Sequence, residues 1–212
     1  VLLGEGEEVL LELLAAETSG ETADYASISG LVYCEETAVF THNPRRPVMK
    51  QIDKIPFPAW DLIDVERYRK IWVAQNGYYS MNMSTTRGCP YHCNWCAKPI
   101  WGQRYSSRNP ESVAEEMKWL KETYQPDHIW FADDIMGLKP GWWQQFADAV
   151  ERHDARIPFK CLSRADLIVR DDDSVSALAR AGCDIIWIGA ESGSQKILNG
   201  MDKGTTVEQI YE

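Results

Sequence analysis

Three cysteines lie close together in this sequence, at Cys89, Cys93 and Cys96. The residues around them, Gly88 and Pro90 among them, are typical of a loop rather than of an apolar helix face. Thiolates gathered on one short loop are good metal ligands, so this segment predicts a metal site. The remaining cysteines are scattered along the chain, and we expect them to be buried thiols: Cys34, Cys161 and Cys183.

The spacing Cys-x3-Cys-x2-Cys leaves more than one metal chemistry open. A structural zinc site needs four ligands, and His92 would have to fold back on its own loop to be the fourth. A bacterial ferredoxin loop would need a closer first spacing and a fourth cysteine followed by proline, which this loop lacks. Three thiolates suit a cubane iron–sulfur cluster whose fourth iron is left open for a substrate or cofactor.

The elements that must position this loop alternate between strand and helix from about residue 79 onward. Apolar runs predict strands over residues 80–86, 128–131, 159–162 and 185–188. Amphipathic spacing predicts helices from Asn109, over 141–152, over 174–181 and from about Thr206. This alternation predicts a parallel sheet whose strands, including 185–188, are covered on both faces. The polar residues that follow the strands are candidate site residues, because α/β barrels build their sites at the carboxyl ends of strands.

The front of the chain has a different pattern. Residues 1–3 are expected to end a buried strand, and residues 7–16 to form a helix. A hairpin is predicted from residues 28–32 and 37–41, with its turn at Glu35–Glu36. Residues 42–60 contain four prolines and are expected to be an extended linker. We place a domain boundary within residues 50–75.

Charge and composition exclude several classes of protein. Twenty-two basic and 32 acidic residues give a net charge of −10, which argues against general nucleic-acid binding. A hydrophobic content of 44% with 25% charged residues excludes global disorder. No apolar run approaches the roughly 20 residues that span a bilayer, and the start lacks the basic region of a signal peptide. We therefore expect a cytoplasmic protein without a membrane span.

The segment Thr85–Cys96 resembles the signature loop of the radical S-adenosylmethionine superfamily, with the expected aromatic residue before the last cysteine. The resemblance implies a 4Fe–4S cluster on Cys89, Cys93 and Cys96, with S-adenosylmethionine bound to the open iron. Reductive cleavage of S-adenosylmethionine would then yield a 5′-deoxyadenosyl radical. The resemblance also implies a small-molecule substrate and an electron donor such as flavodoxin or ferredoxin.

The same resemblance suggests contacts to S-adenosylmethionine after the second and third strands. Ala132-Asp133-Asp134 stands where the family often has a Gly-Gly-Glu turn that receives the amino group, so Asp133 or Asp134 is expected to bind it. A helix cap is the structural alternative for both. Arg164 is expected to hold the methionyl carboxylate by paired hydrogen bonds, with a surface ion pair as the alternative.

Further cofactor contacts are expected after the fourth strand and within the cysteine loop. Glu191 and Ser192 are candidates for the ribose hydroxyls or the amino group, and a simple turn is the alternative. Gly189 and Gly193 beside them permit close backbone approach. Trp95 is expected to pack over the cluster near the adenine, with a loop anchor as the alternative.

The fragment Gly4-Glu5-Gly6-Glu7 and the later Ile55–Asp61 resemble the cobalamin-associated branch of this superfamily, which implies cobalamin as a further cofactor. That branch contains methyltransferases and an anaerobic ring-forming enzyme of chlorophyll synthesis, so methyl transfer or oxidative cyclisation is implied. The expected fold is α/β, a partial (β/α)6 TIM-like barrel preceded by the end of a Rossmann-like cobalamin-binding domain. Its expected divisions are the domain end (1–20), hairpin and linker (21–77), and truncated barrel (78–212).

Two rival functions follow from the same residues. A methylthiotransferase-like enzyme of this superfamily would need further cluster cysteines and a nucleic-acid-binding tail, which the acidic balance disfavours. A non-catalytic zinc or electron-transfer module is the rival from another class. Because only four strand–helix units are visible where the family barrel has six, we expect this sequence to be a piece of a longer protein.

Overall fold

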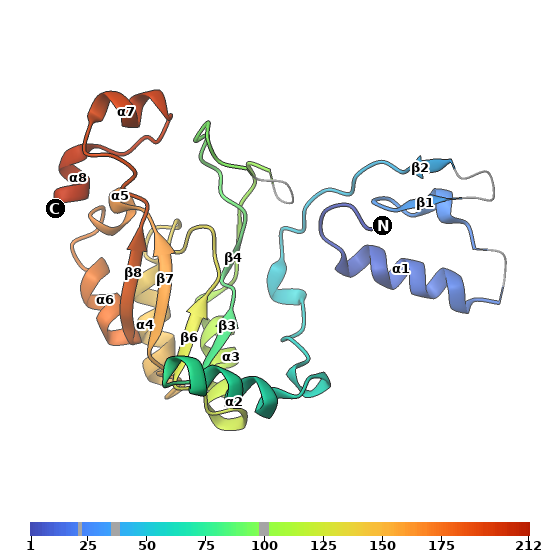
Figure 1. Cartoon of the computed structure of the whole chain (residues 1–212), viewed down its shortest axis with the longest axis horizontal. Helices are drawn as coiled ribbons and strands as arrows, with labels where there is room; N and C mark the ends of the chain where they lie inside the picture. Colours follow the sequence, from blue (N-terminus) through green and yellow to red (C-terminus); the bar gives the residue numbers. More distant parts are fainter. Residues whose placement is uncertain (21–22, 35–38, 98–101) are drawn as a thin grey trace.

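The computed structural model describes residues 1–20, 23–34, 39–97 and 102–212. An α/β unit forms the larger part, and a small N-terminal module lies to one side of it (Figure 1). The helices are α1 (Glu7–Thr18), α2 (Val65–Asn76), α3 (Pro110–Thr123), α4 (Trp142–Arg152), α5 (Ala165–Ile168), α6 (Ser174–Ala181), α7 (Gln195–Gly200) and α8 (Val207–Tyr211). The strands are β1 (Val32–Cys34), β2 (Phe40–His42), β3 (Ser80–Met83), β4 (Thr86–Arg87), β5 (Ser106–Ser107), β6 (His128–Phe131), β7 (Phe159–Ser163) and β8 (Cys183–Ile188). Short 3-10 turns are η1 (Tyr25–Ser27), η2 (Ile52–Lys54) and η3 (Trp60–Leu62).

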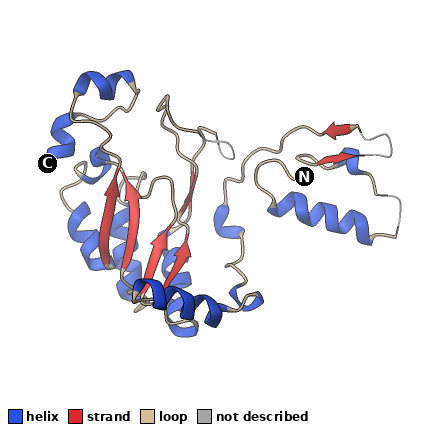
Figure 2. Ribbon diagram, in the orientation of Figure 1, coloured by secondary structure: helices blue, strands red, loops and turns tan. Residues whose placement is uncertain are grey.

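The α/β unit is built on a four-stranded parallel sheet with the order β3-β6-β7-β8. Met81 lies opposite Ile129, and Cys161 lies opposite Ile186. Helices α3, α4 and α6 pack in a row against one face of this sheet (Figure 2). The strand–helix alternation in the sequence therefore predicted the sheet correctly, because each helix returns the chain to begin the next parallel strand.

The helix-covered face holds a continuous apolar core. Phe131 and Phe159 on the sheet contact Phe146 of α4, with all three side chains fully buried. Trp142 stacks on Phe146 with ring centroids 5.0 Å apart, and Trp143 beside it is 1% exposed. The aromatic pair at the start of α4 thus packs into the core.

Local signals set the ends of these helices. The Asn109 side chain accepts a hydrogen bond from the backbone N–H of Glu111, and Pro110 occupies the first turn of α3, as predicted. Gly182 ends α6 in a left-handed conformation. Gly137 is needed for packing, because a Cβ there would lie 2.0 Å from the Trp143 ring.

The N-terminal module combines α1 with the antiparallel hairpin β1–β2. Its buried apolar cluster consists of Val9, Ile28 and Leu31. The predicted hairpin is present, but β1 begins at Val32, later than expected, and its predicted turn lies outside the described residues. Cys34 at the end of β1 is exposed, so the expectation that it is buried was wrong. Cys161 is buried and Cys183 is half-buried.

The predicted extended linker contains more structure than its prolines indicated. Turns η2 and η3 interrupt it, and helix α2 follows between the Asp64 side-chain cap and Gly77, which is left-handed. Helix α2 was not predicted from the sequence, because most of its apolar residues are exposed and form no buried stripe. Arg69 joins α2 to the α/β unit, because its guanidinium lies over the Tyr79 ring and donates a hydrogen bond to the Tyr124 carbonyl.

Strand β8 differs from its prediction. Residues 185–188 were expected to be buried on both faces, yet Ile185 is 51% and Trp187 is 55% exposed. β8 is the last strand of the described sheet, so it has a neighbour on one edge only. On the sheet face away from the helices, Trp187 approaches Trp130, whose ring also contacts the Lys160 ammonium at 3.7 Å. None of the described helices is both long and apolar enough to cross a membrane.

Candidate functional site

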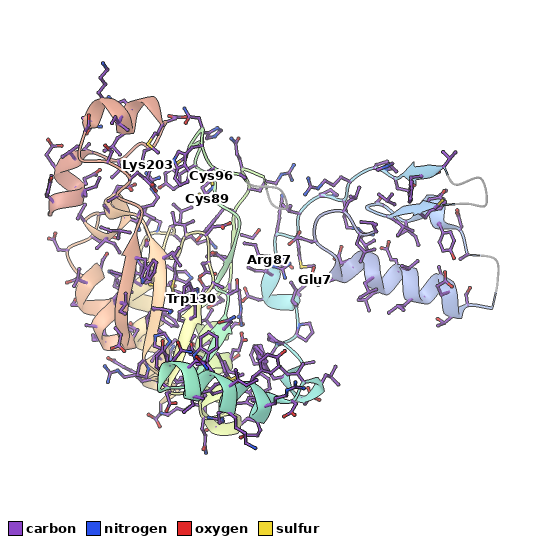
Figure 3. The ribbon with its side chains drawn as sticks, viewed as in Figure 1. Glu7, Arg87, Cys89, Cys96, Trp130 and Lys203 are labelled. Atoms are coloured by element: carbon purple, nitrogen blue, oxygen red, sulfur yellow. The ribbon has the colours of Figure 1, made fainter. Side chains whose placement is uncertain are left out.

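The three clustered cysteines lie on a loop that hangs from a short β-ribbon. Strands β4 and β5 pair antiparallel, with Arg87 opposite Ser106, and close the base of this loop. Gly88 allows the sharp turn into Cys89 through its φ of +79°. Cys89 and Cys96 lie close to Lys203 beyond the end of β8 (Figure 3).

Neighbouring elements also hold the tip of the cysteine loop. The Asn94 backbone N–H donates to the Met201 carbonyl at 3.1 Å, and its side-chain amide donates to the Gly200 carbonyl at 2.7 Å. Within the loop, the Cys96 N–H donates to the Cys93 carbonyl. The loop is therefore anchored to the end of α7, which lies far from it in the sequence.

All three thiols open onto one cavity of about 330 Å³ at the carboxyl ends of the sheet strands. The polar and aromatic side chains that share its lining are Trp95, Asp134, Ser163, Arg164, Trp187, Glu191 and Lys203. A single cavity thus brings together thiols, carboxylates and cations from the cysteine loop and from the ends of β6, β7 and β8.

The spacing of these thiols bears on which metal they suit. Sulfurs around one tetrahedral zinc lie about 3.8 Å apart. Within the described ranges, Glu111, Glu115 and His153 form a group whose potential ligand atoms all lie within 4.8 Å of one another, whereas the three thiols form no such group. His92 is exposed. A multi-iron cluster, in which each iron takes its own thiolate, does not need so close a group of ligand atoms.

Asp133 supports the turn that leads into the cysteine loop. Its carboxylate is 3% exposed and accepts hydrogen bonds from the backbone N–H groups of Thr85 at 2.7 Å and Thr86 at 2.9 Å. The hydroxyls of Thr85 and Ser84 donate to it as well. Burial raises the pKa of the Asp133 carboxyl, while these hydrogen bonds favour its charged form. Asp133 does not line the cavity, whereas Asp134 does.

Arg164 is a buried connector between β7 and two other segments. Its guanidinium donates to the Asp166 carboxylate at 2.8 Å, the Lys203 carbonyl at 2.7 Å and the Thr205 hydroxyl at 2.8 Å. It also stacks 3.6 Å from the Tyr91 ring in the cysteine loop. With 5% of Arg164 exposed, the alternative of a surface ion pair was wrong.

Glu191 and Lys203 form an ion pair at the cavity wall. Lys203 Nζ lies 3.1 Å from Glu191 Oε1, and the Lys203 side chain is 8% exposed. Gly189 makes room for this pair, because a Cβ there would lie 2.8 Å from Lys203 Nζ. The Ser192 hydroxyl instead accepts the backbone N–H of Ser194 within its own turn, and Ser192 does not line the cavity. Sequence reasoning missed Lys203 because it lies twelve residues beyond its partner.

Comparison with known proteins identifies the family. Residues 83–212 match the Radical SAM superfamily, which covers more than half of this chain. The chain belongs to the radical SAM superfamily. The resemblance seen in the cysteine loop is thereby confirmed.

Relatives of this radical SAM chain include methyltransferases and cyclases. An uncharacterized methyltransferase, PH0819, of Pyrococcus horikoshii is 30% identical over all of this chain and 44% of the relative. An anaerobic magnesium-protoporphyrin IX monomethyl ester cyclase of Synechocystis is 27% identical over 97% of this chain and 40% of the relative. The chain therefore spans less than half the length of these curated relatives.

Solved structures confirm the predicted fold of this radical SAM chain. The methyltransferase TsrM from Kitasatospora setae aligns with a TM-score of 0.75 at 22% identity, over 99% of this chain and 41% of TsrM. The enzyme OxsB aligns with a TM-score of 0.72 at 24% identity, over 97% of this chain and 30% of OxsB. Both likenesses extend through the N-terminal module, since they cover nearly the whole chain.

Proposed function

We propose that this chain is the cluster-binding part of an enzyme that cleaves S-adenosylmethionine reductively and starts radical chemistry on a small molecule. Cys89, Cys93 and Cys96 would hold a 4Fe–4S cluster, which when bound supplies the electron for the cleavage. The observation that carries the proposal is the single cavity onto which three thiols of one loop open together with Asp134 and Glu191. Three cysteine ligands on a four-iron cluster leave one iron free to bind a cofactor.

The carboxylates of the cavity suit the ammonium group of a methionyl chain. Asp134 and Glu191 are the acidic residues that line it, from the ends of β6 and β8. Asp133 has its oxygens turned toward the Thr85–Thr86 turn, so we assign the amino contact after β6 to Asp134 and give Asp133 the task of shaping the loop. Lys203 orients the Glu191 carboxylate through their ion pair at the cavity wall.

Arg164 and Trp95 complete the proposed arrangement. Arg164 would position the loop through Tyr91 and the Lys203 segment, and a methionyl carboxylate at its cavity side would meet a fixed guanidinium. Trp95 is 54% exposed in the cavity lining, which leaves its ring free to cover an adenine. Ser192 faces its own turn, so a ribose contact from it would require that turn to open.

The relatives support a narrower assignment. PH0819 is named a methyltransferase, and the Synechocystis relative is named a cyclase, so we propose methyl transfer or oxidative cyclisation as the reaction. The titles of OxsB and one TsrM structure name cobalamin as a bound group, and we propose cobalamin as a further cofactor of this protein. Flavodoxin or ferredoxin would supply electrons in the cytoplasm, and no nucleic-acid partner is proposed.

Anaerobic reconstitution of the protein with iron and sulfide tests this proposal. We expect about four irons per chain, an EPR signal that changes when S-adenosylmethionine is added, and 5′-deoxyadenosine after reduction. Cys93→Ser should abolish all three results, because it removes one of the three ligands. Cys34→Ser is the matched control, since Cys34 lies exposed at the end of β1, and it should retain all three.

The opposite result would identify the rival module. Stoichiometric zinc with no cleavage of S-adenosylmethionine would exclude the proposed enzyme. Binding of cobalamin is tested separately by absorbance spectroscopy on the anaerobically purified full-length protein. An absence of any corrinoid band after incubation with cobalamin would exclude that cofactor and leave the cluster assignment intact.

A further inference from the structure

A partly buried charged network, in which the Glu7 side chain is 39% exposed, joins the N-terminal module to the base of the cysteine loop. Arg87, two residues before Cys89, donates to Glu5 Oε1 at 2.9 Å and to Glu7 Oε1 at 2.5 Å. The Glu5 side chain is 8% exposed and that of Arg87 is 21% exposed. Figure 3 shows Arg87 and Glu7 where the module meets the α/β unit. The contact links residues that are about eighty positions apart in the sequence.

The network closes into a ring through the linker. The second oxygen of Glu5 accepts the backbone N–H of Met49. The Met49 carbonyl in turn accepts the Ser106 hydroxyl at 2.9 Å. Ser106 lies opposite Arg87 in the β4–β5 ribbon, so the ring returns to its start. Four separate segments are thereby fixed relative to one another at the ribbon that carries the cysteine loop.

The chemistry of this closed hydrogen-bond network indicates that it positions the segments it joins more than it stabilises the fold. Neither ion pair contributes much net stability, because desolvation offsets most of the attraction at the buried Glu5, and solvent screens the more exposed Glu7. The guanidinium is a rigid planar fork, and here its two terminal nitrogens address two different carboxylates. Such a fork fixes both distance and angle, whereas a lysine ammonium on a flexible stem would fix neither.

We propose that Arg87 is a positioning residue that sets the cysteine loop against the N-terminal module. This inference rests on the proposed function, because the loop matters to catalysis only if it holds the cluster. Arg87 does not line the cavity and so makes no contact there with a bound cofactor. It acts through the ribbon, whose position decides where Cys89 and the residues after it enter the cavity.

The test compares Arg87→Gln with Arg46→Gln in the reconstituted full-length protein. Arg46 is the matched control, because it bridges two glutamates of α1, Glu8 and Glu12, and within the described residues makes no hydrogen bond or ion pair with β4 or β5. We expect Arg87→Gln to lower kcat for 5′-deoxyadenosine formation per cluster by roughly 10- to 100-fold, since misplacement of about 1 Å costs that much. The KM for S-adenosylmethionine should change little, because the proposed contacts lie in the cavity.

One further variant and one spectroscopic measurement sharpen the comparison. Arg87→Lys keeps the charge but loses the fork, so it should restore less than half of the lost kcat. The EPR spectrum with S-adenosylmethionine should change in Arg87→Gln and stay unchanged in Arg46→Gln. Equal kcat values and EPR spectra in wild type and Arg87→Gln would overturn the proposal. A loss of kcat that scales only with lost iron would also overturn it, since Arg87 would then be merely structural.

A readout without any cofactor separates this inference from the proposed function. In the apo protein, Arg87→Gln should speed amide hydrogen exchange in residues 102–107 and in the first turn of α1 together. Arg46→Gln should speed exchange in α1 alone. If the wild type binds zinc and cleaves nothing, the proposed function fails, and the coupled exchange still shows whether Arg87 joins the two parts. Uncoupled exchange would overturn the positioning role even in an active enzyme.

Discussion

The α/β unit and the N-terminal module hold their shapes by different means. Under the sheet, a continuous apolar core extends from Tyr79 on one side to Ala181 on the other, with Phe146 fully buried among further aromatic rings. The described part of the module has a smaller apolar cluster, formed by Val9, Ile28 and Leu31, and Val32 of β1 is buried as well. So small a cluster buries too little apolar surface by itself to offset the entropy of ordering the module.

Charged contacts orient the module on the rest of the chain. The module is joined to the linker and ribbon by Arg46, which pairs with Glu8 and Glu12, and by Arg87, which pairs with Glu5 and Glu7. Apolar burial is non-directional, whereas a guanidinium between two carboxylates is directional. The apolar core of the α/β unit therefore supplies most of the stability of the fold, while the ion pairs set the orientation of the N-terminal module relative to it.

The largest loss of stability is expected when a substitution creates a cavity in the apolar core of the α/β unit. Phe146→Ala should lower the free energy of unfolding by about 3–5 kcal/mol, because its ring contacts Phe131, Phe159 and Trp142. Chemical denaturation monitored by circular dichroism measures the loss. Phe40→Ala is the matched control in the module, since Phe40 is 63% exposed, and it should cost less than about 0.5 kcal/mol. Similar losses in the two variants would contradict the contrast between the regions.

A smaller and more local loss of stability is expected from a substitution in the buried apolar cluster of the N-terminal module. Val9→Ala should destabilise α1 by about 2 kcal/mol through two lost methyl groups and the cavity they leave. Hydrogen exchange should then quicken in α1 while β6 and β7 keep their protection. Leu11→Ala on the same helix is the control, because Leu11 is 68% exposed. Faster exchange in α1, β6 and β7 together would show that the N-terminal module and the α/β unit unfold as one unit.

The smallest effect is expected from the exposed ion pairs of the module. Arg46→Gln should cost less than about 1 kcal/mol at low salt, since Glu8 and Glu12 are half exposed. This cost should shrink further toward about 0.5 M sodium chloride, where screening weakens exposed pairs. The loss from Phe146→Ala should stay constant over the same range. A salt-independent loss from Arg46→Gln would mean that its packing, and not its charge, joins α1 to the linker.

Much of the α/β unit could be read from local patterns. The residues of β6 match the predicted strand, and the start of α3 at Asn109–Pro110 follows its cap. The three cysteines were found by spacing alone, because their chemistry depends on residues adjacent in the chain. Helix α2 escaped detection, since an exposed helix carries no buried stripe and only its caps at Asp64 and Gly77 indicate it.

The remaining parts of the site depend on contacts that no local pattern encodes. Sequence placed polar residues after strands, but it could not say that Asp133 turns inward to Thr85 while Asp134 faces the cavity. The Glu191–Lys203 pair and the Arg87 network join segments from different elements. The sequence by itself determined where the three cysteines gather, the alternation of strands and helices in the parallel sheet, and the resemblance to the family. Only the tertiary structure decided which charged groups meet, because buried charges are fixed by whichever partners folding brings within hydrogen-bond distance.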